Sequence, residues 1–139
     1  MAGWNPTTES YDKLYYVGIS PPMLDFDIDP CKGYWISAVT AETLTLRGYQ
    51  STGQVYTLVD VPAGGGWALL GVPSLEEGLM ASEIAAMYAG EVTAVAAWNA
   101  ATQMYQTYYP GTPTDFVVSP GRGVWLMCAE GAWFTYAAA

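Results

Sequence analysis

The hexapeptide PGRGVW, Pro120 to Trp125, repeats the pattern of PCKGYW, Pro30 to Trp35. Both stretches have the order Pro-x-basic-Gly-x-Trp. Proline presets the first corner of a tight turn, and Gly121 suits the left-handed second corner of a type II turn. Cys31 stands at that corner in the first copy, which favours a type I turn there. We therefore expect each hexapeptide to be a turn that leads into a strand.

The residues after each turn alternate with the period of two that is typical of strands. One face of the first predicted strand holds Tyr34, Ile36 and Ala38. A segment of roughly 45 residues rarely supports a core alone, so this face needs a cover. We expect the cover to be the matching face of the second strand, with a helix over residues 74–89 closing one side. We also expect Trp35 and Trp125 to be equivalent and buried, in one shared core. That second face holds Val124, Leu126 and Cys128.

Longer segments match around the hexapeptides. WNPTTESYDKLYYVG (4–18) matches WNAATQMYQTYYPG (98–111), with Tyr15 aligned to Tyr109, and DFDIDPCKGYW matches DFVVSPGRGVW. We infer that residues 4–48 and 98–137 are two copies of one β-rich half-unit. A middle segment of different character, residues 56–94, separates them.

The middle segment predicts two strands, a helix and a further strand. The strands are expected at 56–61 and 67–72, around a turn at 62–66, and at 92–98. Ser74 and Glu77 fit a capping box, and an apolar face at helical spacing extends the predicted helix over 74–89. The fold class is therefore α+β, mostly β, in a single domain over residues 1–136. The alanines 137–139 are interpreted as an added tail.

The charge balance excludes several classes of function. The chain has 139 residues, 13 acidic, 4 basic and no histidine, for a net charge of −9. A nucleic-acid surface needs clustered Lys and Arg, and a bilayer span needs about 18 to 20 apolar residues, so neither is expected. Without histidine the common zinc sites and His-based triads are excluded. We expect neither an enzymatic activity nor a cofactor. Four glutamates could in principle form the carboxylate pair of a glycosidase: Glu76, Glu77, Glu83 and Glu91. They lie on or beside the predicted helix, where acidic side chains interact favourably with the helix dipole.

A run of alternating carboxylates is the best candidate for a metal site. On a strand, Asp25, Asp27 and Asp29 would share one face, and clustered oxygens are the ligands that Ca²⁺ prefers. However, Pro30 stands where an EF-hand loop needs glycine, and the second copy keeps only Asp115. We interpret the run as a solvated strand face, with a Ca²⁺ site as the alternative.

Aromatic residues recur in both half-units. Flat rings can stack on sugars, and the candidate platform consists of Trp98, Tyr105, Tyr108 and Tyr109. The alternative, which recurrence in both copies favours, is that the rings form core contacts and cross-strand pairs. Cys31 and Cys128 are compatible with a disulfide or with two small apolar residues, and the sequence does not choose.

The order of these motifs resembles a repeated module of secreted and cell-surface proteins. GWALLGVPS, a short helix, a strand ending in Trp98, a Tyr-rich strand and PGRGVW follow one another as in archaeal and bacterial S-layer-like or adhesin-like chains, where the motif usually reads Pro-Gly-Lys-Gly-Tyr-Trp. Residues 66–136 would be one complete unit and 4–48 the second half of a preceding one. The resemblance implies a non-catalytic structural or adhesive domain of a larger extracellular or cell-surface protein. The implied partners are other domains of the same protein, cell-surface components or polysaccharide.

Overall fold

The computed structural model describes residues 1–29, 32–40, 43, 45, 53–59, 61, 64–72, 77–88, 90–129 and 132–138. Within them the protein is mostly β, with one short α-helix. The elements are β1 (Ala2–Asn5), β2 (Ser10–Leu14), the 3₁₀ helix η1 (Pro22–Leu24), β3 (Tyr34–Trp35), β4 (Gly53–Val59), β5 (Gly66–Gly71), α1 (Ala81–Met87), β6 (Val92–Asn99), β7 (Met104–Tyr108), β8 (Gly123–Cys128) and β9 (Ala132–Ala138).

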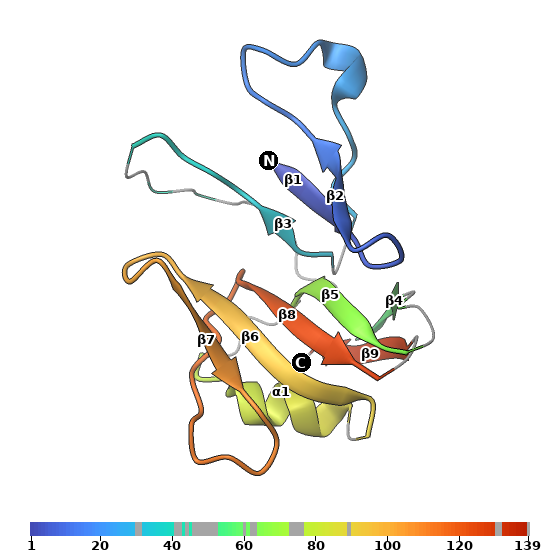
Figure 1. The fold of residues 1–139 in the computed structure, drawn as a ribbon, viewed down its shortest axis with the longest axis vertical. Coiled ribbons are helices and arrows are strands. Elements are labelled where there is room, and N and C mark those ends of the chain that lie inside the picture. The colour runs from blue at the N-terminus through green and yellow to red at the C-terminus, as the bar shows by residue number, and fades with distance from the viewer. Residues whose placement is uncertain are drawn as a thin grey trace.

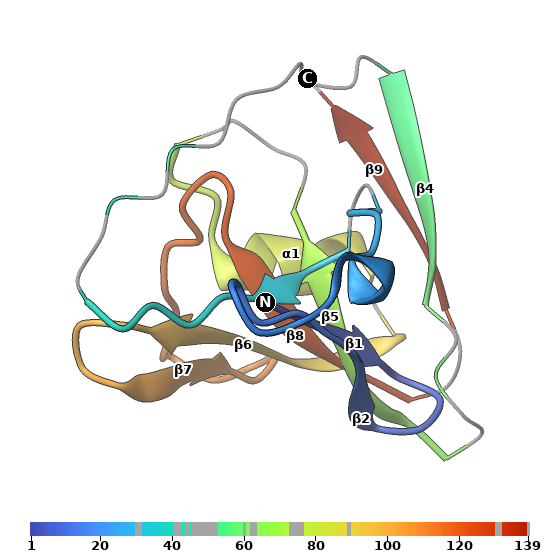
Figure 2. The ribbon, with the colours of Figure 1, turned by 90° about the horizontal axis from the view of Figure 1, so that it is seen from above.

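Two antiparallel sheets and the helix form three layers. A three-stranded sheet of order β2-β1-β3 lies on one side of a four-stranded sheet of order β5-β8-β6-β7. Helix α1 lies on the other side of the four-stranded sheet (Figures 1 and 2). The four-stranded sheet is therefore the middle layer.

Strands β4 and β9 form a separate antiparallel ribbon, paired from Gly53 with Ala138 to Val59 with Ala132. The two strands predicted on either side of the 62–66 turn therefore do not pair with each other, since β5 pairs with β8. Two of the three final alanines belong to β9.

The two sheets repeat one pattern of strand pairing. In the first sheet, Trp4 pairs with Tyr11 across the β1–β2 hairpin, and Ala2 pairs with Trp35 across β1 and β3. The order β7-β6-β8 in the second sheet corresponds to β2-β1-β3 in the first. The corresponding pairs there are Trp98 with Tyr105 and Ala96 with Trp125.

The two hairpin loops also share their local geometry. The side-chain oxygen of Asn5 accepts hydrogen bonds from the backbone of Thr7 and Thr8, as an asparagine at a turn commonly does. Asn99 accepts the equivalent bonds from Ala101 and Thr102. Each loop then has a non-glycine residue with left-handed backbone, Glu9 at φ 47° and Gln103 at φ 55°.

A β-bulge changes the register of the first hairpin. Gly3 pairs with Lys13 while Trp4 pairs with Tyr11, so Asp12 is the additional residue. Beyond the bulge, Tyr15 exchanges hydrogen bonds with Met1 at 2.9 and 2.8 Å. The equivalent pair in the second hairpin is Val95 with Tyr108. The alignment of Tyr15 with Tyr109 was therefore wrong, because one inserted residue makes Tyr108 the counterpart.

The helix begins later than the sequence predicted. Its first residue is Ala81, and Glu77 lies in a turn before it. Ser74, the other half of the predicted capping box, lies outside the described residues. The cap is provided by Glu83, whose carboxylate accepts a hydrogen bond from the backbone N–H of Met80 at 2.8 Å.

The aliphatic core lies between α1 and the four-stranded sheet. Ala81, Ile84 and Ala85 of the helix are buried against it. Among the described residues, those that form this core cluster all lie within 61–128. The strand members of the cluster that come from β5, β6 and β8 are Ala68, Leu70, Val92, Val95, Ala97, Val124, Leu126 and Cys128.

The predicted mutual cover of two strand faces is wrong. Val124, Leu126 and Cys128 belong to the core that α1 covers, and Ile36 on the supposedly matching face is 49% exposed. The sheets meet instead through the tryptophan-bearing faces of β3 and β8. Both faces of these strands carry apolar residues, so alternation alone did not identify which faces meet.

Candidate functional site

Four tryptophans meet between the two sheets in a reciprocal arrangement. The ring of Trp4 lies edge-on to that of Trp125, with centroids 4.9 Å apart and planes at 81°. The ring of Trp98 lies edge-on to that of Trp35, with centroids 5.4 Å apart and planes at 68°. Because Trp4 corresponds to Trp98 and Trp35 to Trp125, each sheet gives the other the same contact.

Two equivalent tyrosines extend this aromatic layer. Tyr11 contacts Trp4 at a centroid distance of 5.1 Å, and Tyr105 contacts Trp98 at 5.0 Å. Both contacts are edge-on, a geometry that ring quadrupoles favour. Burial raises the pKa of Tyr11, and the nearby Tyr105 adds to the rise.

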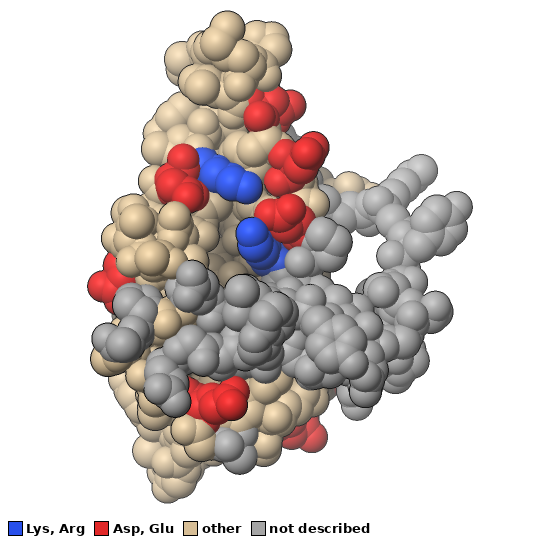
Figure 3. Space-filling model, turned by 90° about the vertical axis from the view of Figure 1, so that its right-hand side faces the viewer, with Lys and Arg blue, Asp and Glu red and all other residues tan. Residues whose placement is uncertain are grey.

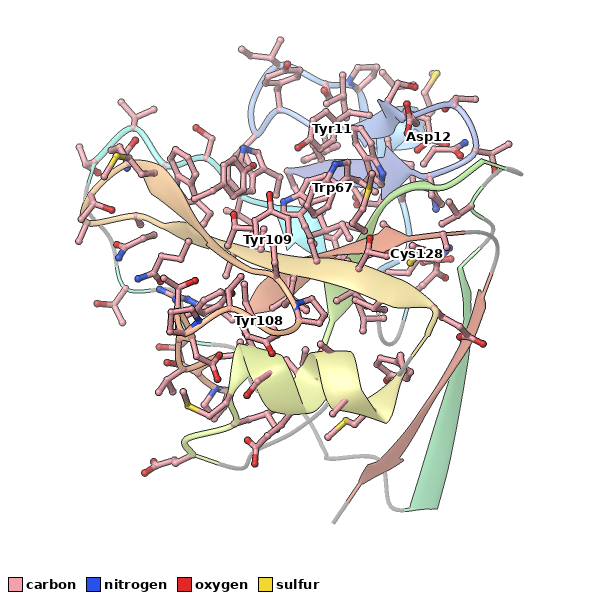
Figure 4. All side chains as sticks on the ribbon, turned by 60° about the horizontal axis from the view of Figure 1, so that its bottom comes forward. Tyr11, Asp12, Trp67, Tyr108, Tyr109 and Cys128 are labelled. Atoms are coloured by element: carbon pink, nitrogen blue, oxygen red, sulfur yellow. The ribbon has the colours of Figure 1, made fainter. Side chains whose placement is uncertain are left out.

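A cavity of about 430 Å³ opens within this layer. The backbone carbonyl of Trp67 accepts a hydrogen bond of 2.8 Å from the indole N–H of Trp4, which holds that ring against β5. Trp67 and Tyr11 both lie in the layer between the sheets (Figure 4). The described residues that line this cavity are Trp4, Glu9, Trp67, Ala96, Tyr105, Thr107 and Trp125.

Glu9 is the charged residue among the described lining of the cavity. Its left-handed backbone is uncommon for a residue with a side chain. The carboxylate lies over Gly66, where a Cβ would come within 2.9 Å of its oxygen. A side chain at position 66 would therefore displace Glu9, and the glycine makes room for it.

The four residues of the predicted sugar platform are divided between two places. Trp98 and Tyr105 lie in the aromatic layer, with ring planes at 68° rather than parallel. Tyr108 and Tyr109 line a second cavity of about 460 Å³ beside α1. Tyr105 and Tyr108 are three residues apart on β7, so their side chains leave opposite faces of the sheet. Figure 4 shows Tyr108 on the helix side.

The aspartate run does not form the expected strand. Residues 25–29 have no regular secondary structure, and Asp25 accepts a hydrogen bond from the backbone N–H of Phe26. Asp29 forms ion pairs with Lys32 at 2.9 Å and Lys13 at 3.8 Å. The hydrogen bond and charge of Lys32 lower the pKa of Asp29. Among the residues that the structure describes, no three His, Cys, Asp or Glu side chains are grouped to bind a metal ion.

The remaining polar candidates are dispersed. Glu83 caps the helix and Glu91 is exposed in the following turn, whereas Glu76 lies outside the described residues. Cys128 is a buried free thiol whose pKa burial raises to about 11, with a smaller effect from Glu91. Cys31 lies outside the described residues. No helix within the described part of the chain has the length and apolar character needed to span a bilayer.

Sequence reasoning missed Glu9 and Trp67 as lining residues. A signal for Glu9 was present, because the two aligned hairpins differ there, with glutamate in one and Gln103 in the other. Trp67 had no comparable signal, since β5 belongs to the middle segment and the described residues of the three-stranded sheet include no counterpart strand. Comparison of the chain with protein-family models, with curated proteins and with solved structures finds no match.

Proposed function

We propose that this chain is a non-catalytic structural or adhesive domain of an extracellular or cell-surface protein, built from two copies of one half-unit. The observation that carries the proposal is the reciprocal contact of Trp4 with Trp125 and of Trp98 with Trp35. Contacts exchanged in this way are what two copies of one unit make when they pack around an approximate twofold axis. The half-units then share an aromatic layer, while the aliphatic core belongs to the second half and the middle segment.

The distribution of charge supports a scaffold rather than an enzyme. On the face shown in Figure 3, acidic side chains are spread over the surface, and the basic side chains lie beside them. Asp29, Lys13 and Lys32 form one such group. The resemblance of the motifs to modules of S-layer-like and adhesin-like chains favours the same role. The partners would be neighbouring domains of the same protein and components of the cell surface.

Carbohydrate binding at the predicted platform is less well supported. It would need Tyr108 and Tyr109 on the same surface as Trp98 and Tyr105, and the two pairs line different cavities or layers.

Protease treatment of intact cells that express the gene tests the proposed location. An antibody raised against the purified chain should lose its epitope after proteinase K treatment, while a cytoplasmic marker persists. An epitope that is cleaved only after lysis would overturn the cell-surface location. An in-frame deletion of the segment should then weaken surface attachment or resistance to osmotic shock. Loss of a specific metabolic conversion instead would contradict a non-catalytic role.

A further inference from the structure

The cavity in the aromatic layer has the composition of a site for an alkylated cation. Its lining brings together three tryptophans and one tyrosine, and the rings of Trp4 and Trp125 meet nearly at right angles. Perpendicular rings form walls, whereas a sugar platform presents rings in one plane. The volume of about 430 Å³ falls within the range of roughly 300 to 1,000 Å³ that is usual for small-molecule sites.

The lining of the cavity is mostly apolar surface. The indole N–H of Trp4 already donates to the carbonyl of Trp67. The remaining polar side-chain groups named in the lining belong to Glu9, Thr107, Tyr105, Trp67 and Trp125. A pyranose carries several hydroxyls and a primary ammonium carries three N–H donors, each of which needs a partner when buried. A quaternary ammonium has no N–H, and its methyl groups can fill an apolar cavity.

The charge of the cavity complements such a cation. Among the described residues that line it, none is basic and Glu9 is acidic. The faces of tryptophan rings attract cations through their quadrupoles, and the attraction grows when the ion is removed from water. The carboxylate of Glu9 would add a direct Coulomb attraction.

The second hairpin provides an internal comparison. Gln103 stands at the position of Glu9 and has the same left-handed backbone, so this backbone conformation does not require a carboxylate. The negative charge is therefore confined to the hairpin whose loop reaches the cavity beside Trp67. From the aromatic walls, the mostly apolar lining and the charge, we propose that this cavity binds a quaternary ammonium group.

The proposal is tested by titrating the purified full chain with choline chloride at constant ionic strength. Binding is monitored by tryptophan fluorescence and by isothermal titration calorimetry. Choline should saturate a single site and shift the indole N–H signals of Trp4, Trp67 and Trp125 in a ¹H–¹⁵N spectrum. The neutral isostere 3,3-dimethyl-1-butanol should bind about tenfold more weakly or worse, because it lacks the cation–π attraction.

Two matched variants separate the charge of Glu9 from general effects. Glu9→Gln should weaken choline binding about two- to fivefold, as expected for an exposed charge pair, and leave binding of the neutral alcohol unchanged. Gln103→Glu adds the same charge to the equivalent loop and should leave choline binding unchanged. Gln103 shows that glutamine adopts the required backbone, and far-UV circular dichroism with the melting temperature checks that both variants fold.

Three results would overturn the proposal. Equal affinity for choline and the neutral alcohol would mean that the cavity is merely apolar. Saturation by methyl glucoside without a response to choline would make it a sugar site. The absence of saturable binding by any of these probes would mean that the cavity holds no ligand of this kind. Each of these results leaves the structural role of the domain to be judged on its own tests.

Discussion

The ring of Trp4 in the β1–β2 hairpin packs edge-on against that of Trp125, the last residue of the second hexapeptide, with centroids 4.9 Å apart. Trp98 and Trp35 make the same contact in the opposite sense, at 5.4 Å. The repeated order of the two motifs in the chain thus has a physical consequence, because each copy presents a tryptophan on its first strand and another after its turn. The aromatic layer is where the two halves stabilise each other.

Replacement of Trp125 by alanine should destabilise the whole domain. Trp125 is 8% exposed, and loss of a large buried aromatic costs about 3 to 5 kcal/mol of unfolding free energy. A double-mutant cycle with Trp4→Ala should give a coupling energy of about 0.5 to 1.5 kcal/mol, the usual value for an edge-on aromatic pair. Urea unfolding followed by far-UV circular dichroism measures both. Tyr16→Ala, at a 58% exposed site, is the control and should change stability by less than about 0.5 kcal/mol. Additive effects of the two tryptophan replacements would show that the contact contributes nothing.

The glycines at equivalent positions of the two hexapeptides should respond differently to alanine. A Cβ on Gly33 would lie 2.5 Å from Cγ of Leu69, whereas the nearest atom to a Cβ on Gly123 is 3.5 Å away. Gly33→Ala should therefore destabilise the protein by about 1 to 3 kcal/mol through overpacking. Gly123→Ala should be neutral or slightly stabilising, because alanine loses less backbone entropy on folding. Melting temperatures compare the two variants, and equal destabilisation would contradict the packing argument.

Fragments should differ in their ability to fold. Among the described residues, those of the core cluster all lie within 61–128, so a fragment of residues 53–138 should fold and unfold cooperatively at a lower temperature than the whole chain. Residues 1–48 should be unfolded alone, because they bring too little buried apolar surface. The intact chain should unfold in one transition, since the aromatic layer couples its parts. Circular dichroism and the spread of amide chemical shifts in an NMR spectrum distinguish folded from unfolded fragments. A folded 1–48 fragment would mean that the first half-unit is an independent module.

Asp115 should make stability depend on acid. Burial would raise the pKa of this carboxyl, but hydrogen bonds from Ser82 and Phe116 outweigh it and lower the pKa below the ordinary 3.8. The folded state therefore favours the charged form. The stabilisation is fully present above the ordinary pKa and is lost as pH falls through the lowered value.

The variant Asp115→Asn tests this interaction. The carboxylate accepts a hydrogen bond of 3.1 Å from the N–H of Ser82, in the first turn of α1, so its loss should cost about 1 kcal/mol at neutral pH, as for other side-chain caps. Urea midpoints of wild type and variant should converge by about pH 2, where the wild-type carboxyl is also protonated. Asp27→Asn, at an exposed site, controls for removal of a charge. A difference that persists unchanged at low pH would exclude the carboxylate as its source.

Local features of this protein follow from its sequence. Gly121 has the left-handed backbone, at φ 75°, that the predicted type II turn requires, because proline and glycine constrain the chain within a few residues. The β8 strand after it and the mostly β character follow from the period-two pattern in the same way. The repeat itself identified Trp4, Trp35, Trp98 and Trp125 as a related set, although not as partners.

The tertiary structure decided everything that depends on contacts between distant segments. Strands 34–35 and 123–128 have apolar residues on both faces, so the sequence pattern does not say which face of each strand is covered by which layer. The placement of α1 decided that the face of β8 with Val124 and Leu126 enters the aliphatic core. The tryptophan-bearing face of β8 then meets the other sheet. The pairing of β4 with β9 and the approach of Glu9 to Gly66 likewise arise between residues that no local rule connects. Backbone preference acts over a few residues, whereas the choice of partner is made by the whole set of surfaces that must be buried together.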